Sequence, residues 1–210
     1  MMRRNALLAC GKRNRLPSAY QEVEYIASTG TQAILTDIPC QLPLKTDIDI
    51  MFTTNNNSYF CGTQYGGVRI CSGGNYSRYI HWAFRKYQND GNIDTNVRYL
   101  LSTTLENGNQ SVRKDGNAVI SKTLALTEAE LSRMSGNLGL FAMWYNDTQS
   151  FTQFAKARCY GVKISSADNL LGDFIPCYRK SDGEIGMYDT VSKTFYTNAG
   201  TGTFLKGADV

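Results

Sequence analysis

The sequence predicts an all-β fold, namely a two-sheet antiparallel sandwich of the jelly-roll type with one short helix. Three observations support this prediction. The chain has 13 Tyr, 9 Phe and 19 Gly among its 210 residues, a composition typical of strands joined by many turns. Short apolar runs recur along the sequence with turn signals between them. Several of these runs alternate between apolar and polar side chains, which indicates strands with one face in a core and one in solvent.

The predicted strands follow one another along almost the whole chain. Residues 47–50 read Asp-Ile-Asp-Ile, which places both carboxylates on one face of a half-buried strand. Asp115-Gly116 indicates a tight hairpin, because both residues tolerate positive φ. The strands are predicted over 22–27, 32–36, 46–53, 58–62, 68–71, 76–84, 97–105, 111–114, 117–121, 138–145, 158–165, 170–177, 185–188 and 194–197.

One helix is predicted, over 128–134. Thr127 and Glu130 match the capping-box pattern of a helix start, and Gly136 matches a helix end. No repeat of solenoid length and no low-complexity linker follows Leu16. The sequence therefore predicts a single sandwich domain over 16–210.

The two ends of this predicted domain carry distinctive motifs. Residues 16–32 read LPSAYQEVEYIASTGTQ, residues 173–189 read DFIPCYRKSDGEIGMYD, and residues 195–204 read FYTNAGTGTF. These motifs resemble a family of concanavalin A-like (LamG-type) jelly-roll domains found in phage and prophage structural proteins of gut bacteria. The resemblance spans 16–207. It implies that the two ends lie close together, with the 23–27 run near the C-terminal strands.

The resemblance also implies a function. It implies a non-enzymatic structural or adhesive component of a bacteriophage virion, on a tail, a tail fibre or the capsid surface as a decoration. Its partners would be other virion proteins and host-surface polysaccharide, with a homo-oligomer or many copies in one assembly. Two alternatives stay open, because one fold hosts many functions: a glycoside hydrolase and a secreted bacterial adhesin domain.

Positive charge is concentrated at the N-terminus. The basic residues of the first fifteen positions have no acidic residue among them, and they are Arg3, Arg4, Lys12, Arg13 and Arg15. The rest of the chain has 17 basic and 18 acidic side chains, so the body lacks the charge of a nucleic-acid-binding surface. Residues 1–15 are predicted to form an extended attachment arm outside the sandwich, although a merely solvated terminus has the same composition.

No export or membrane signal is recognised. The apolar stretch 6–9 is too short for the core of a signal peptide, and no segment has the length of a membrane span. The expected location is therefore the virion, assembled in the cytoplasm of a bacterial host and released by lysis.

The six cysteines are expected to be buried free thiols. They are Cys10, Cys40, Cys61, Cys71, Cys159 and Cys177, and no two are spaced as in a CxxC motif. Several lie in strand-like runs, where a free cysteine behaves as a small apolar side chain. Cys61 and Cys71 flank a turn-rich stretch and are the pair best placed for a disulfide, although assembly in a reducing cytoplasm argues against one.

No catalytic residues are predicted. A glycoside hydrolase needs two carboxylates facing one another across a cleft, and no strand carries acidic residues in that register. His81 is the only histidine, and Gly-x-Ser-x-Gly and phosphate-binding glycine loops are absent. The acidic residues are therefore interpreted as solvated surface groups.

One loop offers oxygen ligands for Ca²⁺. Asp90, Asn92 and Asp94 stand at i, i+2 and i+4, a spacing that Ca²⁺ loops use, and some LamG-like domains bind this ion. Thr95 and Leu101 stand where an EF-hand would place Gly and Glu. The same residue types are common in ordinary turns, so Ca²⁺ is the one cofactor that the sequence leaves open.

Aromatic residues beside polar ones mark the predicted glycan-binding site. A flat ring covers the apolar face of a pyranose, while amide and carboxylate groups bond its hydroxyls. The alternative is that such rings belong to the core. The predicted site residues are Trp144, Tyr145, Asn146 and Asp147 at a strand end, with Tyr79 and Tyr87 as a second platform.

Overall fold

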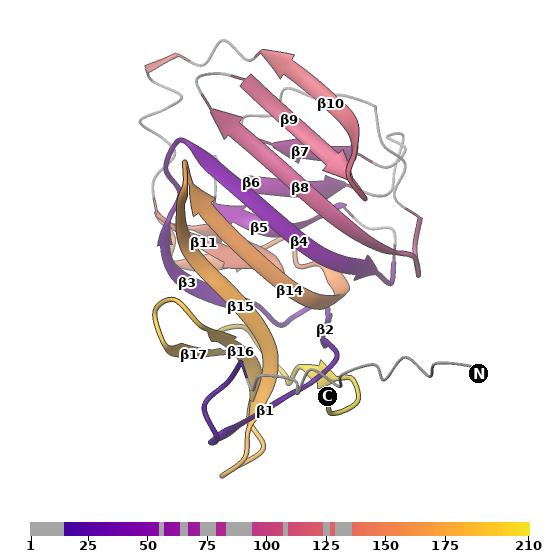
Figure 1. Cartoon of the computed structure of the whole chain (residues 1–210), viewed down its shortest axis with the longest axis vertical. Coiled ribbons are helices and arrows are strands. Elements are labelled where there is room, and N and C mark those ends of the chain that lie inside the picture. Colours follow the sequence, from indigo (N-terminus) through magenta and orange to yellow (C-terminus); the bar gives the residue numbers. More distant parts are fainter. Residues whose placement is uncertain are drawn as a thin grey trace, which may run out of the picture.

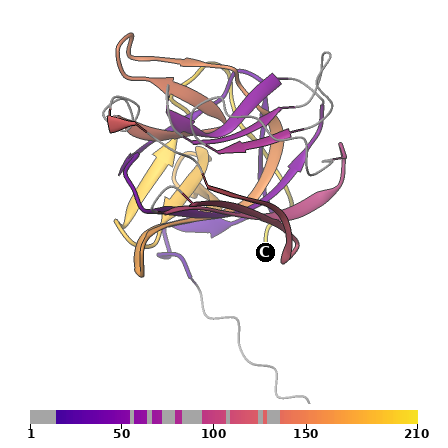
Figure 2. The same cartoon turned by 90° about the horizontal axis from the view of Figure 1, so that it is seen from above.

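The fold is the predicted all-β sandwich, with an 11-stranded sheet as one layer and a 7-stranded sheet as the other (Figures 1 and 2). The computed structural model describes residues 15–54, 57–63, 67–71, 79–82, 94–106, 109–123, 127–128 and 136–210. Strands that follow one another in the sequence pass repeatedly from one layer to the other. This crossing between two layers is the jelly-roll arrangement that the sequence predicts.

The larger sheet presents its outer face to the viewer in Figure 1. Its pairs are antiparallel throughout the described residues. Its strands are β1 (Tyr20–Glu22), β2 (Ile26–Thr29), β4 (Leu44–Phe52), β8 (Arg98–Glu106), β9 (Asn109–Lys114), β10 (Asn117–Thr123), β14 (Lys156–Ser166), β15 (Asn169–Arg179), β16 (Ile185–Asp189), β17 (Thr194–Thr197) and β18 (Leu205–Lys206). The central path runs β10-β9-β8-β4-β14-β15-β16-β17.

The smaller sheet lies behind the larger one in Figure 1. Its strands are β3 (Ile34–Pro39), β5 (Asn57–Thr63), β6 (Gly67–Cys71), β7 (Tyr79–Trp82), β11 (Asn137–Leu140), β12 (Ala142–Tyr145) and β13 (Ser150–Thr152). β12 runs parallel to β5, whereas the other strand pairs described in this sheet are antiparallel. The predicted antiparallel sandwich is therefore correct with one local exception.

The two sheets enclose one main core. In β4, Ile48 and Ile50 are fully buried, while Asp47 and Asp49 are half-buried on the outer face, as the alternation predicts. Aromatic side chains fill the space between the layers, and Phe60 packs edge-on against Phe141 with ring centroids 4.9 Å apart. Each such buried side chain stabilises the fold by about 1.5–3 kcal/mol relative to an exposed position, so the core accounts for much of the stability.

Two of the predicted strands are divided in the structure. The 22–27 run is split between β1 and β2, and the 138–145 run is interrupted at Phe141 between β11 and β12. Phe141 is fully buried and has a φ of 64°, a conformation that a bulky residue adopts only where the surrounding packing imposes it. Alternation alone does not reveal such a break. The Asp115-Gly116 hairpin is confirmed, with φ of 50° and 80°.

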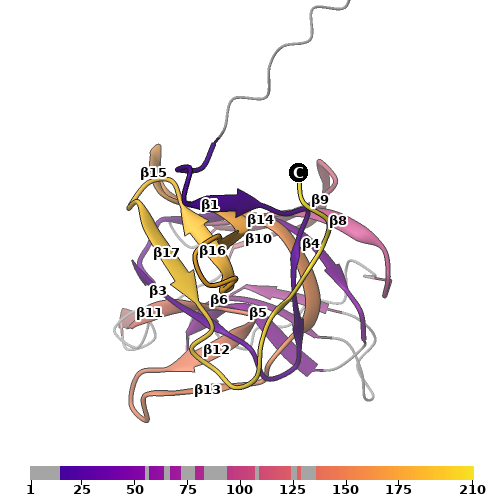
Figure 3. The ribbon, with the colours of Figure 1, turned by 90° about the horizontal axis from the view of Figure 1, so that it is seen from below.

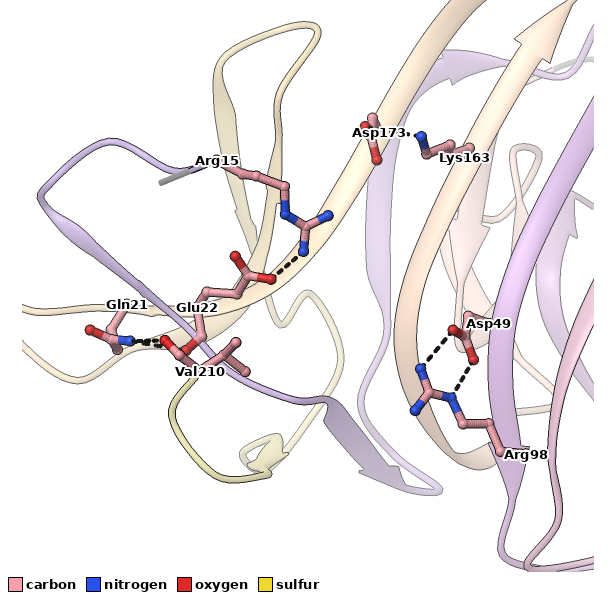
Figure 4. Close-up of polar contacts among 8 residues, drawn as sticks. All are labelled: Arg15, Gln21, Glu22, Asp49, Arg98, Lys163, Asp173 and Val210. Carbon is pink, nitrogen blue, oxygen red and sulfur yellow. Dashed lines mark hydrogen bonds and ion pairs between the residues drawn. The ribbon is translucent and has the colours of Figure 1, made fainter. Parts of the chain in front are cut away.

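The two ends of the described chain lie side by side, as the resemblance implied (Figure 3). β1 pairs with β15, and β2 pairs with both β14 and β18. The Val210 N–H donates to the Glu22 carbonyl, and the Gln21 side chain donates to the Val210 carbonyl at 3.2 Å. Arg15 forms an ion pair with Glu22 at the same place (Figure 4). The other predicted arm residues lie outside the described residues.

The end motifs hold these segments together. The Asn198 side-chain oxygen accepts hydrogen bonds from the N–H groups of Ala33 and Gly200 at 3.0 and 2.9 Å. The Thr201 N–H donates to the Thr31 carbonyl at 2.9 Å, and the buried Gln32 side chain accepts from the Thr29 N–H at 2.7 Å. The motif residues therefore serve to join the first and last turns of the sandwich, which is a structural role.

Cys40, Cys61, Cys159 and Cys177 are buried free thiols, as predicted. Cys61 is opposite Val68 in the sheet, whereas Cys71 is opposite Asn57, so the two cysteines lie about four strand residues, or roughly 13 Å, apart. The disulfide considered between them is therefore excluded. Burial raises the pKa of Cys40 to about 11 and that of Cys177 to about 12, which keeps these thiols unreactive.

The residues of the predicted helix that follow Glu128 lie outside the described residues. No helix in the described part of the chain has the length and apolar character needed to cross a membrane.

Candidate functional site

The predicted glycan-binding hairpin connects β12 to β13. Trp144 is only 8% exposed and packs edge-on against Phe151, with ring centroids 4.8 Å apart. The expectation of an exposed tryptophan ring is therefore wrong, and the reason is that Trp144 and Phe151 are directly opposite each other in the sheet. Tyr145 is half-buried. The hairpin thus lacks an open platform formed by Trp144.

The tip of this hairpin is polar and exposed. Asn146, Asp147, Thr148 and Gln149 are all exposed, and the Gln149 side chain donates to the Asn146 carbonyl at 2.6 Å. This hydrogen bond holds the turn in shape. The hairpin tip therefore offers hydrogen-bonding groups but no stacking ring among its exposed residues.

The remaining predicted site residues are placed only in part. Tyr79 begins β7, of which the structure describes the backbone. Tyr87, Asp90 and Asn92 lie outside the described residues. Asp94 is exposed, and its backbone N–H donates to the Tyr99 hydroxyl at 3.2 Å. Within the described ranges no group of three or more His, Cys, Asp or Glu side chains could hold a metal, and the Ca²⁺ site stays a prediction.

A different surface brings together aromatic and charged side chains from three strands and from the residue that precedes β2. On the outer face of the larger sheet, the Arg98 guanidinium lies 3.8 Å above the centre of the Tyr160 ring. The same guanidinium donates to both carboxylate oxygens of Asp49, at 2.7 and 2.8 Å (Figure 4). Asp49 raises the pKa of Arg98 through this hydrogen bond. Arg98 is 52% exposed and Asp49 32% exposed, so the arrangement faces solvent.

A second stack adjoins the first. Tyr25 meets Tyr160 edge-on, with ring centroids 5.4 Å apart, and the Arg158 guanidinium lies 4.7 Å above the Tyr25 ring. Arg158 and Tyr160 come from β14, and Tyr25 directly precedes β2, which pairs with β14. We call Tyr25, Arg98, Arg158 and Tyr160 the tyrosine–arginine strip.

Local backbone features put the strip on the surface. The β14–β4 register shifts between Cys159 and Gly161, so Tyr160 is the extra residue of a β-bulge. A bulge redirects the side chain of the extra residue, while its neighbours Cys159 and Val162 stay in the core. Gly207 packs directly beneath the Tyr25 ring, since a Cβ at Gly207 would lie 2.8 Å from that ring.

A third pair of similar kind lies beside the strip. Lys206 lies 4.9 Å above the Tyr178 ring and forms an ion pair with Asp209 at 2.8 Å. The Tyr178 hydroxyl also donates to Asp209, at 3.2 Å. Lys206 lowers the pKa of Asp209 through its hydrogen bond. Lys206 and Asp209 are joined to Tyr25 through Gly207, whose N–H donates to the Tyr25 carbonyl at 2.9 Å.

The strip combines the groups that carbohydrate recognition uses. Tyrosine rings supply apolar surface with a polar hydroxyl, and arginine supplies planar N–H donors around them. Each contact between a cation and a ring is stabilised by about 0.5–1 kcal/mol, the value typical of exposed cation–π pairs. The side chains are therefore ordered before any ligand arrives, which lowers the entropic cost of binding.

One local pattern in the sequence points to this surface. Residues 47–50 indicate that Asp49 points outward, but they do not indicate its partners. Arg98, Tyr160 and Tyr25 are 49, 111 and 24 positions away in the numbering, and only the strand order β8-β4-β14, with β2 beside β14, brings them together. The strip was therefore missed, because its members share no sequence spacing.

Comparisons with known proteins give neither a family nor a curated relative. No family model matches the chain, and no curated protein matches it. The resemblance to a phage-associated family thus stays a prediction.

The solved structures that are similar to this chain include the following three. A sialidase has a TM-score of 0.41 and 16% identity, and the match covers 65% of this chain and 14% of the sialidase chain. The carbohydrate binding module CBM66 from Bacillus subtilis has a TM-score of 0.42 and 14% identity, and the match covers 70% of this chain and 96% of the module. The alginate lyase AlgAT5 from Polysaccharide Lyase family 7 has a TM-score of 0.35 and 8% identity, and the match covers 67% of this chain and 61% of the lyase chain. At these values the similarities assign neither a function nor a site to this chain.

Proposed function

We propose that this protein is a non-enzymatic glycan-binding β-sandwich that works as an adhesive component of a phage particle. The observation that carries the glycan-binding part is the tyrosine–arginine strip on the outer face of the larger sheet. Tyr25 and Tyr160 are half-buried. Rings that are in part open to solvent beside fixed hydrogen-bonding groups, held on a rigid sheet, are the features that a sugar-binding surface needs. A single shallow surface of this kind binds weakly and gains strength when many copies are displayed together.

The pKa shifts and ion pairs of several described carboxyl groups support a non-enzymatic role. A glycosidase needs one carboxyl group whose pKa is raised so that it can donate a proton. The carboxyl groups of Asp182, Asp189 and Asp209 instead have lowered pKa values. Asp47 and Asp49 share the outer face of β4, but each is paired with a cation.

Tyr160→Ala is expected to weaken glycan binding about 10-fold or more. The substitution removes the central ring of the strip, and aromatic side chains at the centre of a binding surface commonly carry about 1.4 kcal/mol or more, which equals a factor of ten. Binding is measured by retention of fluorescently labelled protein on host cells and on an array of bacterial surface glycans.

Tyr145→Ala is the matched control for this test, because it also removes a partly exposed tyrosine but lies on the β12–β13 hairpin. It should bind as the wild type does. If Tyr145→Ala loses binding while Tyr160→Ala keeps it, the hairpin is the site and the strip is not. Release of reducing sugar from any array glycan would instead favour the hydrolase alternative.

The particle role rests on residues 1–15, which we propose to be an attachment arm. Deletion of 1–14 retains the Arg15–Glu22 ion pair and the buried Leu16, so the melting temperature should change by no more than about 2 °C, within the small effects typical of exposed termini. The same deletion should abolish recovery of the protein with purified particles. A truncated protein that still co-purifies at wild-type copy number would contradict the proposed arm.

A further inference from the structure

Arg158 differs from the other cations of this surface. Arg98 has Asp49 as its carboxylate partner and Lys206 has Asp209. Arg158 lies on the Tyr25 ring, but among the described residues it has neither a carboxylate partner nor a side-chain hydrogen bond. It is half-buried on the outer face of β14. Its guanidinium is therefore held in place while its donors are left without an anionic partner.

The position of the Arg158 guanidinium over the Tyr25 ring limits where its donors can point. The five N–H groups of a guanidinium lie in one plane and spread around its carbon, so contact with a single ring does not use all of them. A planar carboxylate binds an edge of the guanidinium through two parallel hydrogen bonds. The Arg98–Asp49 pair shows this arrangement on the same sheet face, with both oxygens engaged at 2.7 and 2.8 Å.

Neighbouring groups define the space around Arg158. Arg158 and Arg98 are both directly opposite Met51, on either side of β4. Two strand spacings separate their Cα atoms by about 10 Å, and Tyr160 lies between them in contact with both Tyr25 and Arg98. The negative charge of the exposed Glu24 also contributes to raising the pKa of Arg98. Because Asp49 neutralises Arg98, Arg158 is the cation on which a bound anion would depend.

We infer that the strip recognises a carboxylate-bearing sugar, of the uronic or sialic acid class, with its carboxylate on Arg158 and the rest of the sugar beside Tyr25 and Tyr160. This inference rests on the proposed glycan-binding function and names the class of ligand for that same surface. A charge-assisted pair formed only on binding contributes both affinity and orientation. Such a pair makes binding sensitive to salt, since dissolved ions screen exposed charges with a Debye length of about 10 Å at 0.1 M ionic strength.

The test uses the full-length protein on an array that holds uronate-containing, sialylated, sulfated and neutral glycans. The strongest binder is then measured again after its carboxyl groups have been reduced to alcohols. The variant Arg158→Gln keeps much of the side-chain stem and removes the charge, and Arg158→Lys keeps the charge but not the planar fork. Arg113→Gln is the matched control, since Arg113 is exposed on β9 of the same sheet and donates to the Gly116 carbonyl. Melting temperatures are recorded for every variant.

The expected result is binding confined to carboxylate-bearing glycans and weakened about 10- to 100-fold by carboxyl reduction or by Arg158→Gln, the range for a hydrogen-bonded charge pair. Arg158→Lys should lie between, and Arg113→Gln should match the wild type.

Two outcomes would overturn the inference in distinguishable ways. Binding to neutral or sulfated glycans that depends on Tyr160 but not on Arg158 would leave the proposed function intact and exclude the acidic-sugar assignment. Binding to no glycan of the array, by a protein with a normal melting curve, would remove the proposed function as well.

Discussion

Gly186→Ala is expected to lower the free energy of unfolding by about 3 kcal/mol or more, the upper range for overpacking in a close-packed site. Gly186 is buried in β16 between β15 and β17. A Cβ at this position would lie 2.1 Å from the Tyr196 carbonyl oxygen and 3.0 Å from the Phe195 ring. The carbonyl belongs to the paired backbone, so it can move only if β17 separates from β16. The measurement is urea-induced unfolding, monitored through tryptophan fluorescence.

Gly161→Ala is the control for this effect. Gly161 lies in β14 of the same sheet, and a Cβ there would have no neighbour closer than 3.6 Å. Its stability should change by less than about 1 kcal/mol, as expected where an added methyl group meets no clash. If both variants unfold at the wild-type midpoint, the close approach of β16 and β17 described for Gly186 is incorrect.

Asp189→Ala is expected to cost about 2–4 kcal/mol of stability. Asp189 is 1% exposed, and its carboxylate accepts hydrogen bonds from the N–H groups of Asp173 at 2.8 Å, Val191 at 3.0 Å and Ser192 at 3.1 Å. Removal of the carboxylate leaves three backbone donors without this acceptor, at about 1–3 kcal/mol for each one that water cannot reach. Asp189→Asn should cost less, since one oxygen remains to accept two of the three bonds.

The contribution of Asp189 should also depend on pH. Burial alone would raise the pKa of this carboxyl group, but the hydrogen bonds that it accepts outweigh burial and lower it. A group with a lowered folded pKa stabilises the fold above its unfolded pKa of about 4, and the contribution is lost as the pH falls through the folded value. The difference in unfolding free energy between wild type and Asp189→Asn should therefore shrink below about pH 4. A difference that stays constant from pH 6 to pH 3 would contradict this account.

Local sequence signals predicted most strands of this fold. The alternation in 47–50 placed Ile48 and Ile50 in the core, and Asp115-Gly116 predicted a hairpin with two positive φ angles. These signals are local, because side-chain alternation and turn preference each act over a few residues. The break at Phe141 was not predicted, because the core around that residue, and not its own preference, imposes its conformation.

The candidate site was predicted less well than the fold. Trp144 was expected beside polar residues at a strand end, and the polar residues are exposed while the ring is buried against Phe151. The sequence shows that an aromatic residue is present, but whether its ring meets solvent depends on the residue opposite it in the next strand.

By itself the sequence determined an all-β sandwich and the outward direction of Asp49, and the resemblance of its end motifs to a known family implied that the two ends of the domain lie close together. Only the tertiary structure decided which side chains share a surface. Tyr25, Arg98, Arg158 and Tyr160 come from segments that are far apart in the chain, and the order β8-β4-β14-β2 makes them neighbours. The physical reason is that alternation fixes the face on which a side chain lies, whereas strand pairing and the bulge at Tyr160 fix what lies beside it.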